Sequence, residues 1–270
     1  MRTCRSLRLP AFAGAPLLFT VLLTFMTAVP ASLSPAAATL PFSGEILTFD
    51  VTFLNIPVVT ARLEMTEEGY SGDEPVIHLA VTGRSTPFYS LLYPVDNRYD
   101  AYFTWPSART LRYSRSISEP GVDLQRTIHY DNGLAWTETE DPRPVPGDVR
   151  DLFTALFALR GYALCDSQVI ESTLDLDGQI WIARTTVLGR ETTETGLGEH
   201  DAVKVMVRFQ PMDPDGPERP DSDVMTNNLV KEKTKLTFWF SDDERRLPLR
   251  AEYRMAPFSL KTVLRSAQEQ

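Results

Sequence analysis

The stretch GEILTFDVTF, residues 44–53, alternates apolar and polar side chains with a period of two. Successive side chains of a β-strand point to opposite faces, so this stretch predicts a strand with one buried face and one solvated face. Asn55-Ile56-Pro57 interrupts the pattern, and VTARLEM at residues 59–65 resumes it. The two stretches therefore predict an antiparallel β-hairpin.

Similar alternation recurs along the rest of the chain and predicts further strands. They span residues 76–82, 98–103, 110–116, 125–130, 134–139, 168–174, 180–188, 191–195, 202–209, 233–241, 249–255 and 258–264. Asn132-Gly133, between two of them, tolerates the positive backbone φ of a tight hairpin turn. We therefore expect a mainly β protein, built as one large curved antiparallel sheet or half-barrel of about a dozen strands.

One segment departs from the β rhythm. Apolar side chains over residues 148–160 recur at helical spacing, and Asp148 is placed to cap the amino end. Gly161 is placed to stop the helix, because glycine readily adopts the backbone conformation that ends one. The pattern predicts one central helix, packed on the sheet or covering it.

A shorter helical turn is indicated at residues 87–93, between two prolines. Phe88, Leu91 and Leu92 cluster in this turn. Because large apolar side chains are usually buried, we expect the three to pack against the sheet rather than to face solvent.

Residues 211–228 are rich in Pro and Asp and show no periodicity. Such a composition predicts a mobile surface loop between two strands. The length of the remaining chain is typical of one large all-β domain. We therefore expect residues 39–270 to form a single β-rich domain that carries this loop.

The first 38 residues have the pattern of a secretory signal peptide. Three arginines among the first eight residues precede an apolar run over residues 11–29, and small residues 36–38 follow. The pattern predicts cleavage near Ala38 and export to the periplasm. An uncleaved segment that anchors the protein is the alternative, since about 20 apolar residues span a bilayer. Pro16 interrupts the run and favours cleavage.

The chain is acidic, with 27 basic and 36 acidic residues and a formal net charge of −9. Removal of residues 1–38 takes away three arginines and no acidic residue, leaving 24 basic residues and a net charge of about −12. Such a charge repels phosphate backbones, so we expect no nucleic-acid partner. It also predicts repulsion from anionic membrane surfaces.

No pattern in the chain predicts catalysis or a metal site. His78, His129 and His200 lie on or beside predicted strands, without the neighbours of a nucleophile or metal site. Asp242 and Asp243 are a pair that acid–base chemistry could use, but a turn explains them more simply. We therefore expect no catalytic residue, no metal and no cofactor.

Three arginines stand out from the ordinary charged surface: Arg160 at the helix end, Arg190 after a glycine, and Arg246 at a turn. Arginine pairs well with carboxylates and with the last carbonyls of a helix. One interpretation is a polar network that fastens the helix to strand ends. The other is a site for an anion or a lipid head group at the rim of a cavity.

The order of several motifs resembles an exported family catalogued as domain of unknown function 3108. The motifs are GEILTFDV at 44–51, Ile56-Pro57, ARL at 61–63, DLFTALFALR at 151–160, GRE at 189–191, FWFSDD at 238–243 and RLP at 246–248. The resemblance extends from about Phe42 to Leu264. The chain departs from the pattern at Thr154, where a serine is expected, and in the length of the insert at 211–228.

Members of that family are more distantly similar to LolA/LolB-like half-barrel periplasmic carriers of lipids and lipoproteins. This resemblance implies a curved sheet that wraps an apolar cavity under helices. It also implies which side chains line the concave face, namely Leu47, Phe49, Val51, Phe53, Leu63, Met65, Phe238 and Phe240.

Two functions remain open at this point. The first is a non-catalytic periplasmic carrier of a lipid or another hydrophobic ligand, with Arg160, Arg190 or Arg246 meeting an anionic head group. The second is a scaffold of the cell envelope whose core is filled by the same side chains and which binds a protein partner. A lined cavity and a filled core use the same residues, so the sequence does not separate these functions. It indicates no oligomeric state.

Overall fold

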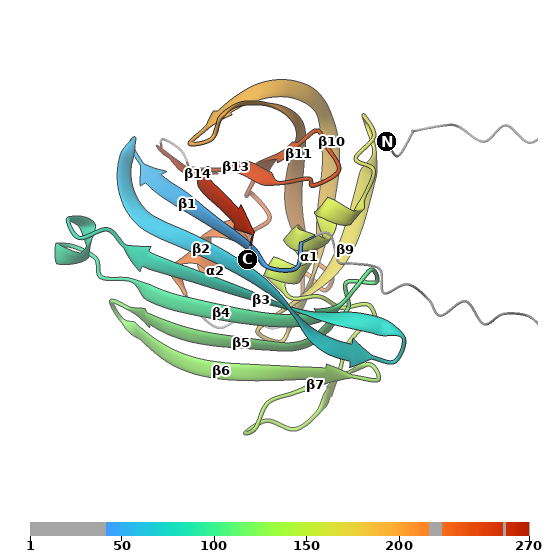
Figure 1. Cartoon of the computed structure of the whole chain (residues 1–270). Helices are drawn as coiled ribbons and strands as arrows, with labels where there is room; N and C mark the ends of the chain where they lie inside the picture. The colour runs from blue at the N-terminus through green and yellow to red at the C-terminus, as the bar shows by residue number, and fades with distance from the viewer. Residues whose placement is uncertain (1–41, 216–222, 256–257, 270) are drawn as a thin grey trace, which may run out of the picture.

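Fourteen strands form one curved antiparallel sheet (Figure 1). The computed structural model describes residues 42–215, 223–255 and 258–269, so the expected signal peptide lies outside the described residues. The strands are β1 (Glu45–Phe53), β2 (Ile56–Ser71), β3 (Glu74–Ser85), β4 (Asp96–Thr104), β5 (Thr110–Glu119), β6 (Val122–Asp131), β7 (Leu134–Trp136), β8 (Arg143–Pro144), β9 (Val169–Leu176), β10 (Gln179–Thr195), β11 (Gly198–Pro211), β12 (Leu236–Ser241), β13 (Pro248–Met255) and β14 (Phe258–Glu269). The mainly β fold expected from the sequence is confirmed.

Sequence neighbours pair almost throughout, and β1 also pairs with β14, so that the chain ends lie at the middle of the sheet. The strand order is β8-β7-β6-β5-β4-β3-β2-β1-β14-β13-β12-β11-β10-β9. The hairpin read from the alternation is present, with Leu47 opposite Leu63 and Phe49 opposite Ala61. This register places the apolar side chains of both strands on the concave face.

The two edges of the sheet, β8 and β9, approach each other without pairing along their length. Arg150, which follows β8 in the chain, is hydrogen-bonded to β9 through its backbone. Its N–H donates to the Thr173 carbonyl at 2.9 Å, and its carbonyl accepts from the N–H of Asp175 at 2.9 Å. The Asp175 carboxylate also pairs with Arg143 and accepts from the Tyr130 hydroxyl at 3.0 Å. We call this meeting of the two edges the seam.

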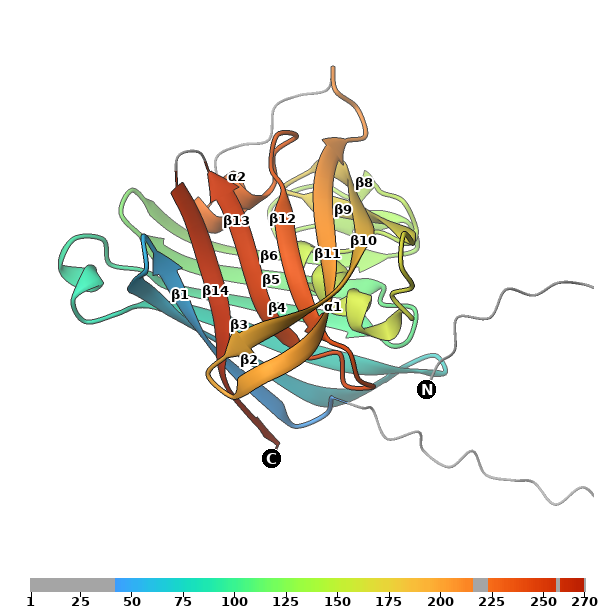
Figure 2. The ribbon, with the colours of Figure 1, turned by 90° about the horizontal axis from the view of Figure 1, so that it is seen from above.

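The helix α1 (Leu152–Ala158) and the 3₁₀ turn η2 (Leu159–Gly161) lie between the two halves of the curved sheet (Figures 1 and 2). Phe157 packs into an apolar cluster formed mainly by β1–β6, and Leu152 packs into a second cluster formed mainly by β9–β12. The central helix is therefore confirmed, over a shorter range than expected. Its cap is Asp151 rather than Asp148.

A second helix, α2 (Val224–Leu229), occupies the end of the segment that the sequence predicted to be a mobile loop. Asp223 caps it, accepting from the Thr226 N–H at 2.8 Å, and also accepts from the Tyr99 hydroxyl at 2.9 Å. Met225 packs against both apolar clusters. The loop prediction was wrong for the residues of α2, because a buried tertiary contact that the local pattern does not show holds the helix in place. Residues 216–222 of the predicted loop lie outside the described residues. None of the described helices is long and apolar enough to cross a membrane.

The expected helical turn is present as η1 (Tyr89–Leu91), in the connection between β3 and β4. Its expected burial was wrong. Phe88, Leu91 and Leu92 are 68%, 82% and 74% exposed. The connection projects past the end of the sheet, so that it has no sheet surface beneath it (Figures 1 and 2).

Candidate functional site

The concave face has two ends with different character. We call the end near the β4–β5 and β12–β13 turns the α1 end. We call the opposite end, near the β1–β2 and β3–β4 connections, the η1 end. Antiparallel pairing alternates the turns between the two ends, so that each predicted site residue can be placed at one or the other.

The α1 end is filled by aromatic side chains. The Phe157 ring lies 5.0 Å from that of Phe42, which lies 5.0 Å from the ring of Trp105, both edge to face. Three residues predicted to line the concave face, Leu47, Phe49 and Met65, are buried in the same cluster. Each large side chain buried in this way contributes about 2 kcal/mol to stability, so this end serves as the core of the fold.

Arg160 is buried at the α1 end and is fully occupied by protein groups. Its guanidinium donates to the Glu45 carboxylate at 2.6 and 3.2 Å and to the Arg245 carbonyl at 2.9 Å. It also lies 4.5 Å over the Phe42 ring. Burial lowers the pKa of Arg160, although the contact with Glu45 opposes this shift. The contacts are those of a structural ion pair.

Arg190 and Arg246 meet at the same end through Asp242, which accepts from them at 2.7 and 2.8 Å. Burial acts against ionisation of Asp242, but the two arginines hold the pKa of this carboxyl below its usual value. Arg246 also donates to the Ala163 carbonyl at 3.2 Å. The two arginines therefore join the β12–β13 turn to the segment after η2, as the network interpretation expects.

Asp243 is engaged in the same turn. Its carboxylate accepts from the Ser241 hydroxyl at 2.7 Å and from the backbone N–H groups of Arg245 and Arg246 at 3.0 and 3.1 Å. These bonds shape the β12–β13 turn.

The η1 end of the concave face is apolar but less covered. Three of the predicted lining residues are half-buried there: Val51, Phe53 and Phe238. They come from β1 and β12. Leu63 is also half-buried, but it lies opposite Leu47 and packs against the cluster of the α1 end. The Phe238 ring stacks on that of Phe240, which is buried, with their centroids 5.9 Å apart. The structure thus divides the apolar predictions between the two ends and leaves the three arginines at the α1 end.

Sequence reasoning missed other residues of this apolar surface. Leu260 lies opposite Phe53 in the β1–β14 register, and Leu260 and Leu229 pack against the cluster formed by β9–β12. The alternation of apolar and polar residues in β14 could have predicted that Leu260 lies on this surface. No local pattern could have predicted this for Leu229, because that residue reaches the surface through the unexpected helix α2.

A buried polar cluster adjoins this surface on β4 and β5. Arg115 pairs with Asp177 in the β9–β10 turn and lies 3.7 Å from the carboxylate of Asp223. Burial and the charge of Asp223 raise the pKa of Tyr99, whose hydroxyl donates to that carboxylate. Arg115 occupies an inward position of an alternating strand, between Tyr113 and Ile117. A charge at an apolar register position was the signal that could have revealed the cluster.

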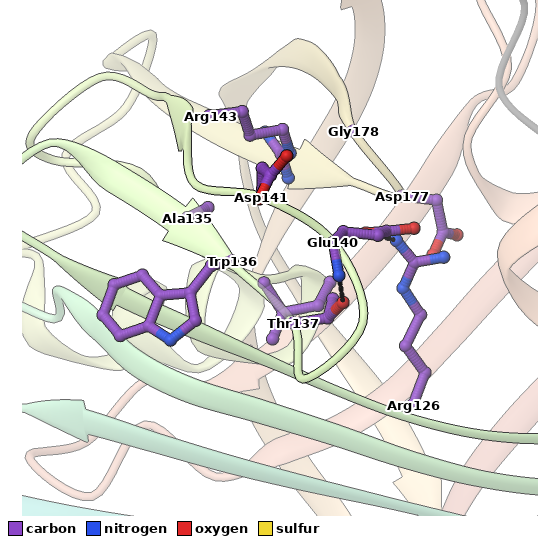
Figure 3. A pocket seen from close by; sticks show the side chains of 10 residues that line it. Arg126, Ala135, Trp136, Thr137, Glu140, Asp141, Arg143, Asp177 and Gly178 are labelled. Atoms are coloured by element: carbon purple, nitrogen blue, oxygen red, sulfur yellow. Dashed lines mark hydrogen bonds and ion pairs between the residues drawn. The ribbon is translucent and has the colours of Figure 1, made fainter.

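Two hollows on the described part of the molecule are lined by other residues than the predicted site residues. One of about 280 Å³ lies beside the seam and is lined by both polar and apolar side chains (Figure 3). Its lining includes Arg126, which pairs with Glu140 at 2.6 Å, and Arg143. The other, of about 320 Å³, lies between Ser85, Asp96 and neighbouring residues of two connections at the η1 end.

The described residues contain no group of three or more His, Cys, Asp or Glu side chains arranged to hold a metal ion. His78 pairs with Asp100, with 2.7 Å between Nε2 and Oδ1, and its ring stacks on that of Tyr102 at 4.3 Å. This histidine therefore takes part in a cross-strand contact.

A family model described as "Protein of unknown function (DUF3108)" matches residues 48–264, and the chain belongs to this family. No curated protein matches the sequence. Among solved structures, a β-barrel-like protein of domain of unknown function DUF1849 from Brucella abortus is similar in fold. It has a TM-score of 0.55 and 10% identity, over 84% of this chain and 97% of that one.

Two further solved structures share less of the geometry. One, from Parabacteroides distasonis, is described as "a putative lipoprotein" and has a TM-score of 0.38 and 12% identity, over 84% of this chain and 95% of that one. The other, from Bacteroides fragilis, is described as "a putative exported protein with YmcC-like fold" and has a TM-score of 0.39 and 9% identity. That match covers 84% of this chain and 96% of the other.

Proposed function

We propose that this member of the DUF3108 family is an exported, non-catalytic protein that binds a lipid or another hydrophobic ligand against the concave face at the η1 end. One observation carries the proposal: Val51, Phe53 and Phe238 lie on the apolar face at the η1 end yet remain half-buried, whereas Leu47, Phe49 and Met65 towards the α1 end are fully buried. An apolar concave surface with incomplete cover gains free energy when an apolar ligand completes it.

The contacts of the polar residues favour an acyl chain or a similarly uncharged group as the bound part. Arg160, Arg190 and Arg246 are engaged by protein carboxylates at the α1 end. A ligand at the η1 end therefore places its apolar part along the strands and its polar part at the rim, in water. This differs from the expectation that one of these arginines meets the head group.

The proposal of a non-catalytic role rests on what the candidate catalytic groups contact. Asp242 and Asp243 are committed to arginines and to a turn, and His78 is committed to Asp100 and Tyr102. The proposal of export to the periplasm rests on the signal-peptide pattern of residues 1–38.

A second function is favoured by the filled α1 end. If the half-buried residues at the η1 end also serve only as core, the protein is an envelope scaffold that binds a protein partner. The aromatic packing around Phe157 and the location of both hollows away from the predicted lining residues support this alternative.

Titration of the purified protein with a fluorescent fatty acid separates the two functions. We expect saturable binding, and we expect Val51→Glu to weaken it by about tenfold or more, because a charge replaces an apolar contact. Thr237→Glu is the matched control, since it lies beside Phe238 but on the opposite face of β12. Far-UV circular dichroism and thermal unfolding of both variants establish that they are folded. A folded wild-type protein that takes up no fatty acid would favour the scaffold.

A further inference from the structure

An apolar rim surrounds part of the η1 end. Phe88, Leu91 and Leu92 are exposed in the β3–β4 connection, and Leu54 and Ile56 are 54% and 51% exposed in the β1–β2 turn. The two segments adjoin, because the Thr86 N–H donates to the Val58 carbonyl at 2.9 Å and the Thr86 hydroxyl donates to the Pro57 carbonyl at 3.1 Å. We call these five exposed residues the apolar rim. Exposed apolar patches of this kind mark interaction surfaces.

The polar groups of the protruding connection are largely satisfied within it. The N–H of Ser90 donates to the Thr86 carbonyl at 2.8 Å, and those of Leu92 and Tyr93 donate to the Tyr89 carbonyl at 3.0 and 2.9 Å. The Ser90 hydroxyl donates to Pro87 at 2.9 Å. An unpaired backbone group is costly in an apolar medium, so a connection with internal bonds can leave water at low cost.

Most lysines of this acidic protein lie at the same end. Of the five lysines in the chain, four lie at the η1 end: Lys231, Lys233, Lys235 and Lys261. Lys261 lies opposite Thr52, two residues from the apolar rim, and Arg254 is 80% exposed on the neighbouring strand. Glu232 lies among the lysines, and Asp96 is paired with Arg84 beside the rim. Acidic residues share the other connections of this end, with Asp213 and Asp215 after β11 and Asp123 after the β5–β6 turn, so the lysines are concentrated here without an excess of positive charge.

We propose that the apolar rim docks on the surface of a phospholipid bilayer that contains anionic lipid, with Phe88, Leu91 and Leu92 entering the interface. The lysines contact head groups, each contributing about 1 kcal/mol near an anionic surface. Tyr89 and Tyr93, which flank the tip, are of the residue type that favours the level of the head groups. A narrow projecting tip with satisfied backbone groups fits a fluid interface better than it fits a flat protein surface.

Vesicle flotation tests this docking surface. Purified protein, with residues 1–38 removed, is floated with vesicles of phosphatidylethanolamine and phosphatidylglycerol. We expect it to float, and we expect Leu91→Glu/Leu92→Glu to lower the bound fraction by about tenfold or more, because two apolar side chains leave the interface. Leu188→Glu/Leu197→Glu is the matched control, since both leucines are exposed on β10 and the β10–β11 turn, outside the rim. The control should float like the wild type.

Two further variants keep the outcomes distinct. Lys233→Glu/Lys235→Glu should reduce flotation with phosphatidylglycerol present and have little effect on vesicles of phosphatidylcholine alone. Fatty-acid uptake by Leu91→Glu/Leu92→Glu should be unchanged, which separates this proposal from ligand binding on the concave face. A wild-type protein that does not float, or rim and control variants that float equally, would overturn the proposal, and the latter result would favour a protein partner for the rim.

Discussion

At the scale of single residues, charged side chains in the interior are paired with side chains of opposite charge. Glu45 is buried and accepts from Arg160 at 2.6 Å and from Arg245 at 3.0 Å. Burial of a charge costs free energy unless an oppositely charged partner compensates it. Removal of one partner therefore leaves the other buried without compensation and destabilises the fold. The pair joins β1, near the start of the described chain, to the end of the central helix.

Replacement of Arg160 by Met should destabilise the protein by about 3 kcal/mol, because Glu45 loses a buried partner. The double variant Arg160→Met/Glu45→Gln should recover part of this loss. Urea unfolding of the two single variants and the double variant measures both effects. The affinity for a fluorescent fatty acid should stay unchanged in Arg160→Met. A large loss of affinity without a loss of stability would instead indicate that Arg160 contacts a head group.

His78 and Asp100 form a matched pair on the convex face. Burial acts to raise the pKa of Asp100, but hydrogen bonds from His78 and Arg98 outweigh it and lower the pKa to about 2. The folded value lies below the ordinary value of 3.8. The carboxylate therefore stabilises the fold above that ordinary value, and its contribution is lost as the pH falls towards the folded value.

Asp100→Asn should cost about 1 kcal/mol of stability at neutral pH, after allowance for partial exposure. The difference between variant and wild type should shrink as the pH is lowered, with about half of it gone near pH 3. Urea unfolding at a series of pH values measures this. A difference that is constant with pH would show that Asp100 acts through packing instead of charge.

At the scale of elements, the start of α1 depends on one carboxylate. Asp151 accepts from the N–H groups of Phe153 and Thr154 at 2.9 and 3.0 Å and from the Thr110 hydroxyl at 2.9 Å. The Thr154 hydroxyl also donates to it, so the threonine that replaces the serine of the family pattern keeps a hydroxyl contact. Burial nevertheless raises the pKa of Asp151.

Asp151→Ala should destabilise the protein by about 2 kcal/mol or more, since it removes the cap and leaves Thr110 without its acceptor. Asp151→Asn should cost less. Because the pKa of the folded carboxyl is raised, the stability from this group is complete below its ordinary pKa and falls as the pH rises through the folded value. The Asn variant avoids that loss at neutral pH. Equal losses for Ala and Asn would contradict this explanation.

Elements with a strong local period could be predicted from the sequence. The β1–β2 hairpin and the central helix follow from spacings that the chain repeats, and the apolar face of each strand follows from the same alternation. The predicted strands at 180–188 and 191–195 are one strand, β10, with a register shift near Gly189. Gly189 suggested a break between two strands, whereas it marks a local irregularity within one continuous strand.

Features decided by contacts between distant segments could not be predicted. The helix α2 exists next to Asp223, whose partner Tyr99 is far away in sequence. Arg160 pairs with Glu45 on β1, which is distant in sequence. Its position at a helix end therefore did not predict whether it binds a ligand or stabilises the fold. Phe88 and its neighbours are apolar in sequence, but their exposure depends on how far the β3–β4 connection extends past the sheet.

At the scale of the whole molecule, the curved sheet has one filled end and one apolar, less covered end. The seam holds its edges together through Asp175 and Asp177, which contact β5, β6 and β8. The helix α1 fixes the α1 end, and the buried ion pairs there join strands to the helix. The η1 end carries both the half-buried concave surface and the apolar rim. The ligand proposal and the bilayer proposal thus assign the same end of the molecule to hydrophobic partners.

Native mass spectrometry of protein purified from the cells that produce it, followed by solvent extraction and lipid analysis, tests the ligand proposal most directly. We predict a reproducible added mass that disappears on extraction, that matches a lipid in the extract, and that is reduced in Val51→Glu but kept in Thr237→Glu. A folded protein with the mass of the polypeptide alone, which also takes up no fluorescent fatty acid, would contradict hydrophobic ligand binding at the η1 end.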